Sequence, residues 1–308
     1  MTNQALTAIK NGWVLLRSIA VISSSGATIV STILPLLLYY SFSVSFIIRL
    51  FCLLLVGSIL IHGILTHLLN DYTDHLSGTD YHSPAILSGG SRVIQNGLIS
   101  AEMMGRLGKG LIAVLIAAVI GLFLFGFLKL AILLSIGLWG AITYSLPPLR
   151  LSYRPIIGEW LSTFPSVLFL GVAGAWLSLD TIPEWAWQNS VINALFCISW
   201  VMVHHIPDYE ADKNAVPSKK TSVVWSVDRF GIAFSRLPAL IYFLLTGLCV
   251  FWLGLERLWA ALGVGLIIAF SIYLILKMNV ESPDEVSNIE KILLLMAVIN
   301  AIWVGIFI

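Results

Sequence analysis

The chain has 308 residues, of which 58% are hydrophobic and 11% charged, and its formal net charge is +1. Its mean hydropathy of +0.95 is far above the value for a soluble domain, so the composition excludes an ordinary soluble enzyme. Lys and Arg are few and form no basic stripe, which argues against a nucleic-acid partner. The composition predicts a protein that crosses the membrane several times.

Nine apolar segments follow one another along the chain, each about as long as a helix that crosses a bilayer. They cover residues 18–40, 46–69, 108–128, 130–146, 157–178, 187–206, 230–252, 258–277 and 288–307. This pattern predicts an all-α membrane protein with nine transmembrane helices. We expect residues 1–308 to form a single domain.

Positive charge is unequally divided between the two faces that these segments connect. One face, which includes the N-terminus with Lys10 and Arg17, holds thirteen Lys and Arg residues, and the other face holds three. An excess of Lys and Arg marks the cytoplasmic side of a membrane protein. The loops predicted to be cytoplasmic are 70–107, 147–156, 207–229 and 278–287.

Two acidic clusters lie far apart in the sequence, and each directly follows an apolar segment. Residues 70–80 and residues 208–212 together contain six of the sixteen Asp and Glu residues. Carboxylates crowded in this way raise each other's pKa unless a cation lies among them. Both clusters fall on the predicted cytoplasmic face, so they are able to form one site.

The spacing within each cluster indicates a metal site. Asp71 and Asp74 are three residues apart and Asp208 and Asp212 are four apart, so each pair shares one face if the chain is helical there. Two facing pairs of carboxylates suit Mg²⁺, which prefers oxygen ligands and keeps room for substrate phosphates. Asn70 adds an amide. The alternative interpretation is that these acids are solvated loop charges paired with nearby Lys and Arg.

Basic and glycine-rich segments lie close to the clusters in sequence. Residues 88–92 read Ser-Gly-Gly-Ser-Arg, in which glycines allow backbone N–H groups to approach an anion and Arg92 offers a two-pronged donor. Lys219 and Lys220 follow the second cluster at a distance that allows them to fold over a phosphate. Tyr144 ends the fourth segment, and Arg150 follows it near the same mouth.

In this order, the motifs resemble those of the UbiA superfamily of intramembrane prenyltransferases. The pattern is Asn70-Asp71-x-x-Asp74-x₅-Asp80, then Ser88-Gly-Gly-Ser-Arg92, then Pro207-Asp208-x-x-x-Asp212 followed by Lys219-Lys220-Thr221. The resemblance covers most of the chain. The five-residue gap before Asp80 is more similar to the menaquinone branch, whose enzymes act on 1,4-dihydroxy-2-naphthoate, than to the 4-hydroxybenzoate branch.

The resemblance implies nine helices around a central cavity that opens to lipid and is capped by cytoplasmic loops. It implies transfer of an isoprenyl chain from a polyprenyl diphosphate to an aromatic acceptor, with Mg²⁺ as cofactor. The implied catalytic residues and metal ligands are Asp71, Asp74, Asp208 and Asp212. The implied substrate-binding residues are Asn70, Asp80, Arg92, Tyr144, Arg150, His205, Lys219 and Lys220. The protein would be an integral, multi-pass membrane enzyme with its active-site loops in the cytoplasm.

The chain departs from the menaquinone branch at two places. His204 and His205 stand where that branch usually has Asn, and residues 216–221 replace a Gly-Lys-Arg-Thr segment. A histidine at this position could act as a base or contact the acceptor, or it could be a hydrogen-bonded packing residue.

Two other functions remain open from the sequence. A terpene cyclase on the same scaffold would use a double bond of the donor itself to capture the carbocation. A cation-coupled transporter would also need intramembrane acids, but such sites usually lie near the midplane between repeats. Here the acids follow the apolar segments at one face.

Overall fold

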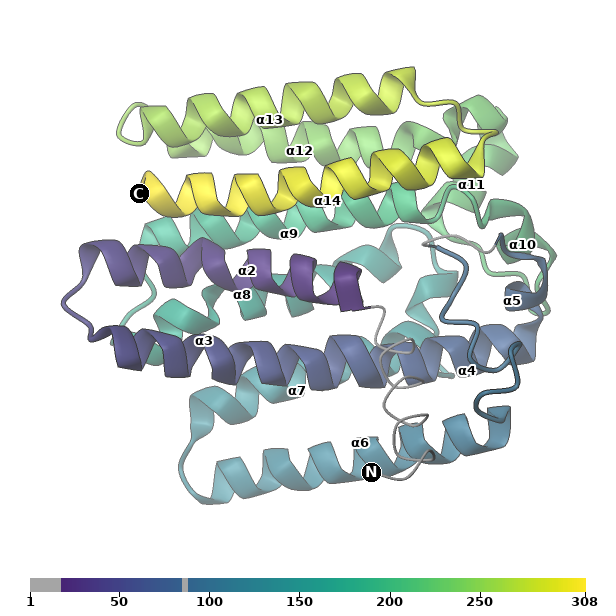
Figure 1. The fold of residues 1–308 in the computed structure, drawn as a ribbon, viewed down its shortest axis with the longest axis horizontal. Coiled ribbons are helices and arrows are strands. Elements are labelled where there is room, and N and C mark those ends of the chain that lie inside the picture. Colours follow the sequence, from purple (N-terminus) through teal and green to yellow (C-terminus); the bar gives the residue numbers. More distant parts are fainter. Residues whose placement is uncertain (1–17, 85–87) are drawn as a thin grey trace.

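The structure is a computed structural model that describes residues 18–84 and 88–308. Lys10 and Arg17, which contribute to the predicted cytoplasmic charge, lie outside the described residues. In the described part of the chain all regular structure is helical, and nine helical runs are long and apolar enough to cross a membrane. Figure 1 shows these runs lying side by side along one direction. The predicted all-α fold is confirmed.

Three of the nine runs combine an α-helix with a short stretch of π-helix or 3₁₀-helix. The nine runs are α2 (Ser18–Tyr39); α3 (Val44–Ser58), η1 (Ile59–Thr66) and α4 (His67–Ser77); α6 (Ala101–Leu124); α7 (Leu128–Ser145); η3 (Glu159–Thr163) and α8 (Phe164–Ser178); α9 (Glu184–His204); η4 (Ile232–Arg236) and α12 (Leu237–Leu253); α13 (Leu258–Lys277); and α14 (Pro283–Ile306). The short elements between them are α5 (Thr79–His82), η2 (Leu151–Tyr153), α10 (Tyr209–Asn214) and α11 (Ser222–Phe230).

The second run differs most from its predicted bounds of 46–69. It continues without a break from Val44 to Ser77, a length of 34 residues, so the first acidic cluster is helical and does not begin a loop. Gly78 ends the helix in the left-handed conformation, with φ of 85°. The prediction stopped at the first polar residues, but these polar side chains are buried against other parts of the chain, which allows the helix to continue.

The third run also begins earlier than predicted, at Ala101 and not at 108. The side chain of Ser100 accepts a hydrogen bond from the backbone N–H of Met103 and caps the helix, and Glu102 lies in its first turn. Both features stabilise a helix N-terminus. Hydropathy alone does not detect such a polar first turn.

Helix α9 is the centre of the bundle. In the most apolar stretch of α9, 83% is buried inside the molecule, compared with 11% for the corresponding stretch of α6 at the edge of the bundle. The amide of Asn189 donates to the carbonyl oxygens of Ser31 and Val304, and Asn193 donates to Thr28. Hydrogen bonds of this kind hold membrane helices together where water is absent. They fix α9 against α2 and α14.

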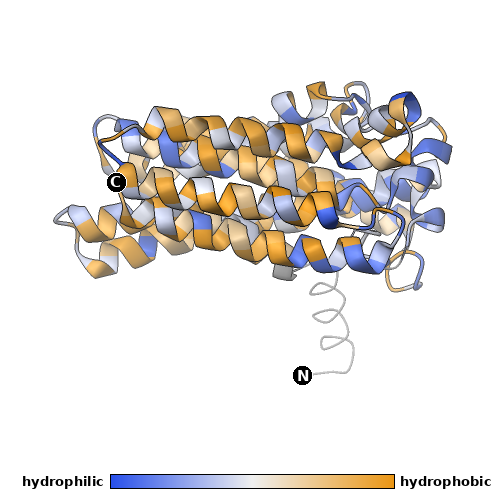
Figure 2. Ribbon diagram, turned by 90° about the horizontal axis from the view of Figure 1, so that it is seen from above, coloured by the Kyte–Doolittle hydropathy of each residue, from blue (hydrophilic) through white to orange (hydrophobic). Residues whose placement is uncertain are grey.

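The polar part of the molecule is gathered at one end of the bundle. Figure 2 shows hydrophilic residues concentrated at the end where the short helices lie, while the long helices are mainly hydrophobic. Helices α5, α10 and α11 lie at this end, with α5 against the end of α4, α10 against α5, and α11 near α12 (Figure 1). The two acidic clusters are therefore at the same end of the bundle, as the sequence predicts.

Candidate active site

A cavity of about 570 Å³ lies between α2, the α3–η1–α4 run, α7, α8 and α9. Most of its wall consists of apolar side chains such as Leu53, Leu133 and Phe169. At one end the wall becomes strongly polar, and Asp74 from α4 and Asp212 from α10 both face the cavity there. The cavity thus joins an apolar chamber to a charged mouth.

The first acidic cluster is held by its own helix and by the following loop. Asp74 accepts a hydrogen bond of 2.8 Å from the amide of Asn70, one turn earlier on α4. Asp71 accepts from the backbone N–H of Ser91 at 3.2 Å and also from the hydroxyl of Ser91. Asp71 and Asp74 are both buried. Of the two, Asp74 faces the cavity, and Asp71 faces the loop that closes over it.

The loop approaches the acids closely at Gly90. This residue has φ of +71°, and a Cβ added to it would be 3.0 Å from Oδ1 of Asp80. The two glycines were predicted to let the backbone approach an anion, and the anion that Gly90 approaches is a carboxylate of the protein. Arg92, two residues later, donates to the carbonyl oxygen of Ser83. Its guanidinium therefore links the two ends of this loop.

The second acidic cluster lies at the C-terminal end of α9. Asp208 directly precedes α10, and the backbone N–H of Asp212 donates to the carbonyl oxygen of Asp208 at 2.8 Å. Both side chains are buried and line the cavity. The four-residue spacing does form one helical turn, as the sequence predicts.

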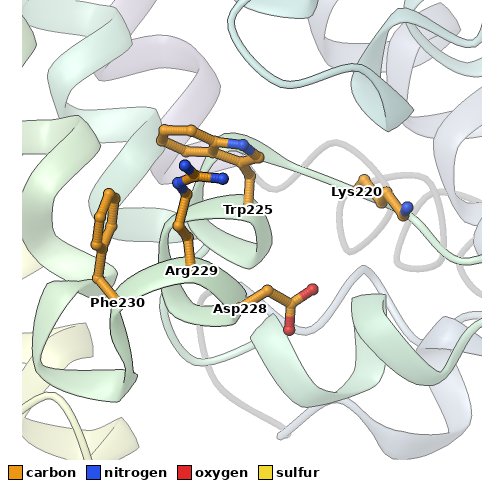
Figure 3. A pocket seen from close by; sticks show the side chains of 5 residues that line it. All are labelled: Lys220, Trp225, Asp228, Arg229 and Phe230. Carbon is orange, nitrogen blue, oxygen red and sulfur yellow. The ribbon is translucent and has the colours of Figure 1, made fainter.

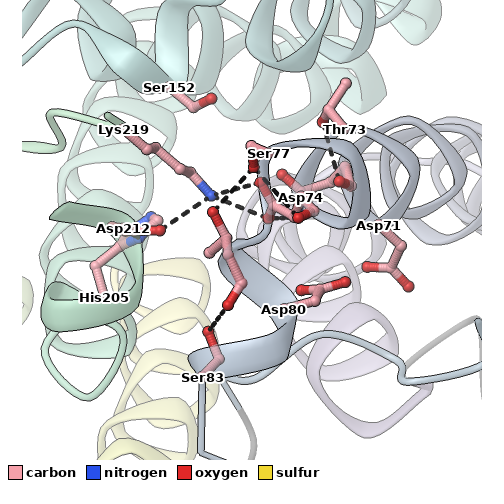
Figure 4. Close-up of polar contacts among 12 residues, drawn as sticks. Asp71, Thr73, Asp74, Ser77, Asp80, Ser83, Ser152, His205, Asp212 and Lys219 are labelled. Atoms are coloured by element: carbon pink, nitrogen blue, oxygen red, sulfur yellow. Dashed lines mark hydrogen bonds and ion pairs between the residues drawn. The ribbon is translucent and has the colours of Figure 1, made fainter. Parts of the chain in front are cut away.

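Lys219 connects the two clusters. Its Nζ is 3.0 Å from Oδ2 of Asp74 and 3.5 Å from Oδ1 of Asp212, and Figure 4 shows the ammonium between them. Burial alone lowers the pKa of Lys219, but the charges of Asp212 and Asp74 outweigh it and raise this pKa well above its ordinary value. Lys219 therefore stays protonated inside the site.

The remaining acids are not neutralised by one ammonium. Burial, and then the charges of Asp74 and Asp71, raise the pKa of Asp80 to about 8. Burial, and then the charge of Asp212, raise the pKa of Asp208 to about 7. The mouth of the cavity thus brings together more carboxyl groups than one ammonium stabilises in their ionised form, and a bound cation would favour that ionised form.

Of the other predicted substrate-binding residues, some line the cavity and some do not. Tyr144 and His205 line it and lie within 3.4 Å of each other through the phenol oxygen and Nε2. Arg150 instead lies over the ring of Tyr153, 5.4 Å from its centroid. Lys220 lines a different, surface pocket with Trp225, Asp228, Arg229 and Phe230 (Figure 3).

Residues 28–298 match the model of the UbiA prenyltransferase family. The chain belongs to this family. Its fold is similar to that of a UbiA homolog from Archaeoglobus fulgidus bound to GPP and Mg²⁺, with a TM-score of 0.61 and 17% sequence identity over 96% of this chain and 99% of that chain. Another structure of a UbiA homolog from the same organism has a TM-score of 0.59 and 17% identity over 96% and 98% of the two chains. No curated protein sequence matches the chain.

The donor atoms of this UbiA-family site suit Mg²⁺. Oδ1 of Asp208 and both carboxylate oxygens of Asp212 are buried and accept no hydrogen bond from the described residues. In residues 18–84 and 88–308, no three His, Cys, Asp or Glu side chains form a group that could hold a metal ion by themselves. Mg²⁺ commonly binds through one or two carboxylates and completes its shell with water and substrate phosphates, so a group of three is not required.

One charged residue near the cavity has no counterpart among the residues predicted from the sequence. Glu290 is fully buried on α14, and its Oε1 is 2.5 Å from Nδ1 of His204, which lines the cavity. Its position inside the predicted segment 288–307 was a usable signal, because a carboxylate within a membrane span is costly and rarely without a role. No spacing in the sequence links it to His204.

Proposed function

We propose that this UbiA-family protein catalyses Mg²⁺-dependent transfer of an isoprenyl chain from a polyprenyl diphosphate to an aromatic acceptor in the membrane. One observation carries the proposal: two acidic clusters from distant parts of the sequence meet at the charged mouth of an apolar cavity. The A. fulgidus homolog bound to GPP and Mg²⁺ supports this choice of donor and metal.

The chain's own residues have distinct roles in this proposal. Asp74, Asp208 and Asp212 would hold Mg²⁺ at the mouth, and Asp71 would contribute from behind the closing loop. The bound metal would neutralise the diphosphate and the charge that develops on it as it leaves. Lys219 is a fixed positive charge beside the same position, and it would share that task.

The apolar chamber would hold the isoprenyl chain and exclude water. An allylic cation in such a chamber reacts with a nearby electron-rich ring, because hydrolysis needs a water molecule that is absent. We propose that the long apolar tail of the donor extends between the helices to the lipid, with the charged mouth on the cytoplasmic side. The positive charges predicted for that side support this orientation.

For the acceptor, a naphthoate of the 1,4-dihydroxy-2-naphthoate type is the first choice. Support comes from the spacing between Asp74 and Asp80, which resembles the menaquinone branch. Tyr144 and His205 are among the polar groups at the cavity wall that are in place to contact such a ring.

The test is a product assay with detergent-purified protein, Mg²⁺ and geranyl diphosphate, offered separately with 1,4-dihydroxy-2-naphthoate, with 4-hydroxybenzoate and with no acceptor. Prenylated naphthoate that disappears in excess EDTA is the expected result. Full turnover in EDTA would contradict the metal site. A cyclic hydrocarbon formed from geranyl diphosphate alone would show a cyclase instead.

A further inference from the structure

Glu290 is a charged side chain to which the proposed donor chemistry gives no role. It lies in the second turn of α14, within a membrane-spanning run, and none of its surface is exposed. Burying a carboxylate in a membrane helix is costly, and a pair of apolar side chains would join α14 to α9 at lower cost. The position of Glu290 therefore points to a use beyond packing.

The carboxylate of Glu290 is aimed at one ring nitrogen of His204. The Oε1 atom lies 2.5 Å from Nδ1 of His204, and a histidine Nδ1–H donates in such a contact. The indole of Trp200 stacks on the imidazole with centroids 5.6 Å apart, and its Nε1–H donates to the backbone oxygen of Glu290. The ring of His204 is thus fixed by residues on both α9 and α14.

The same imidazole forms part of the cavity wall, while Glu290 lies behind it. A carboxylate that fixes Nδ1–H makes Nε2 the basic nitrogen and stabilises the ring once it is protonated. His204 is the last residue of α9 and lies four residues before Asp208 in the sequence, so a ring held beside the diphosphate would be near this histidine. These three features together describe a general base with its orienting partner.

We propose that His204 accepts the hydroxyl proton of a hydroxyarene acceptor, and that Glu290 is the residue that positions it. The inference rests on the prenyl transfer proposed above. The O–H bond of the acceptor breaks, its electron pair stays on oxygen, and the proton moves to Nε2 of His204. The C–O bond of the donor breaks and its electron pair leaves with the diphosphate, and the aryloxide directs an electron pair from its ring carbon to the allylic cation to form the new C–C bond. The proton on that ring carbon then leaves to the diphosphate, which restores the aromatic ring, and Nε2 returns its proton to the oxygen.

His204→Gln and Glu290→Gln test the pair in the full-length protein, with geranyl diphosphate and Mg²⁺. With 1,4-dihydroxy-2-naphthoate we expect kcat to fall by about 100-fold for His204→Gln, the usual contribution of a general base, and KM for geranyl diphosphate to stay unchanged. With fluorinated analogues of increasing hydroxyl acidity the deficit should shrink, because an acceptor that ionises by itself needs no base. The Glu290→Gln variant should follow the same trend with a smaller deficit.

Asn189→Ala is the matched control, because it removes hydrogen bonds of α9 to α2 and α14 away from the mouth. This variant should lower the thermal midpoint, and any fall in its kcat should be the same for acceptors of different hydroxyl acidity. If a single variant fails to fold, the double variant His204→Asn, Glu290→Gln keeps a neutral hydrogen-bonding pair.

Two outcomes would overturn the inference, and they are distinguishable. If the two variants lose the same fraction of kcat with every acceptor, and this loss parallels the fall in thermal midpoint, then His204 and Glu290 only pack α9 against α14. If the unaltered protein prenylates no hydroxyarene, the proposed function fails and the base fails with it.

Discussion

The ammonium of Lys219 lies 3.0 Å from Oδ2 of Asp74, a residue 145 positions earlier in the chain. The same ammonium is 3.5 Å from Asp212. One lysine thus holds together the C-terminal part of α4 and the short helix α10, which are the two sides of the proposed metal site. This contact makes the site a single unit that can be tested from several directions.

Replacing Lys219 by Gln should destabilise the metal-free protein. The change leaves Asp74 and Asp212 buried opposite each other, and removing one partner of a buried ion pair costs about 3 kcal/mol or more. Thermal unfolding in detergent with EDTA measures the effect, and added Mg²⁺ should recover part of the loss. Lys213→Gln is the control, since the pair of Lys213 with Asp228 is about half exposed and worth at most about 1 kcal/mol. Equal shifts for the two variants would contradict the bridging role.

Asp71→Asn and Asp208→Asn should each nearly abolish turnover. Each keeps the shape of the side chain and removes one negative charge from a different cluster. The double variant should be scarcely worse than either single variant, because residues that act as a unit are strongly non-additive. Steady-state kinetics on proteins of matched thermal stability decide the matter. Penalties that simply add would indicate two independent functions.

Arg92→Ala should weaken use of the donor while the protein still folds. Arg92 closes the loop over Asp71 and Asp80 through the carbonyl of Ser83. Arg92 is also predicted to contact the diphosphate of the donor, and losing such a charge-assisted hydrogen bond costs about 1.5–3 kcal/mol, so kcat/KM for geranyl diphosphate should fall about 10-fold or more. Arg92→Lys keeps the charge without the two-pronged geometry and should recover part of the loss. Unchanged kinetics in Arg92→Ala would place Arg92 outside the site.

The metal-free protein should lose stability as pH rises from about 4 to about 8. Burial and the charges of Asp74 and Asp71 raise the pKa of Asp80 from 3.8 to about 8 in the folded state. Between these two values the folded protein binds a proton that the unfolded chain does not, so stability falls with increasing pH across this window and levels off above it. Thermal midpoints in EDTA should fall less steeply for Asp80→Asn than for the unaltered protein. Identical slopes would show that Asp80 is already ionised in the folded state.

The sequence alone determined the features that depend on local composition. A span of about 20 apolar residues is a helix wherever it lies in a bilayer, because no other backbone structure satisfies its own hydrogen bonds there. The nine spans, the two acidic clusters and the family likeness therefore followed from the sequence, with errors at the ends of spans. The largest error was at Asp71 and Asp74, where polar residues continue a helix because Ser91 contacts Asp71 and Lys219 contacts Asp74.

Only the tertiary structure decided which side chains meet. Lys219 and Lys220 are neighbours in the irregular segment between α10 and α11, and the backbone turns tightly at Lys220, where the N–H of Thr221 donates to the carbonyl oxygen of Lys219. One therefore enters the acidic mouth and the other lines the surface pocket with Trp225 (Figures 3 and 4). In the same way His204 meets Glu290 because α9 packs against α14. Contacts between residues so distant in sequence follow from how the helices pack, and no local pattern encodes them.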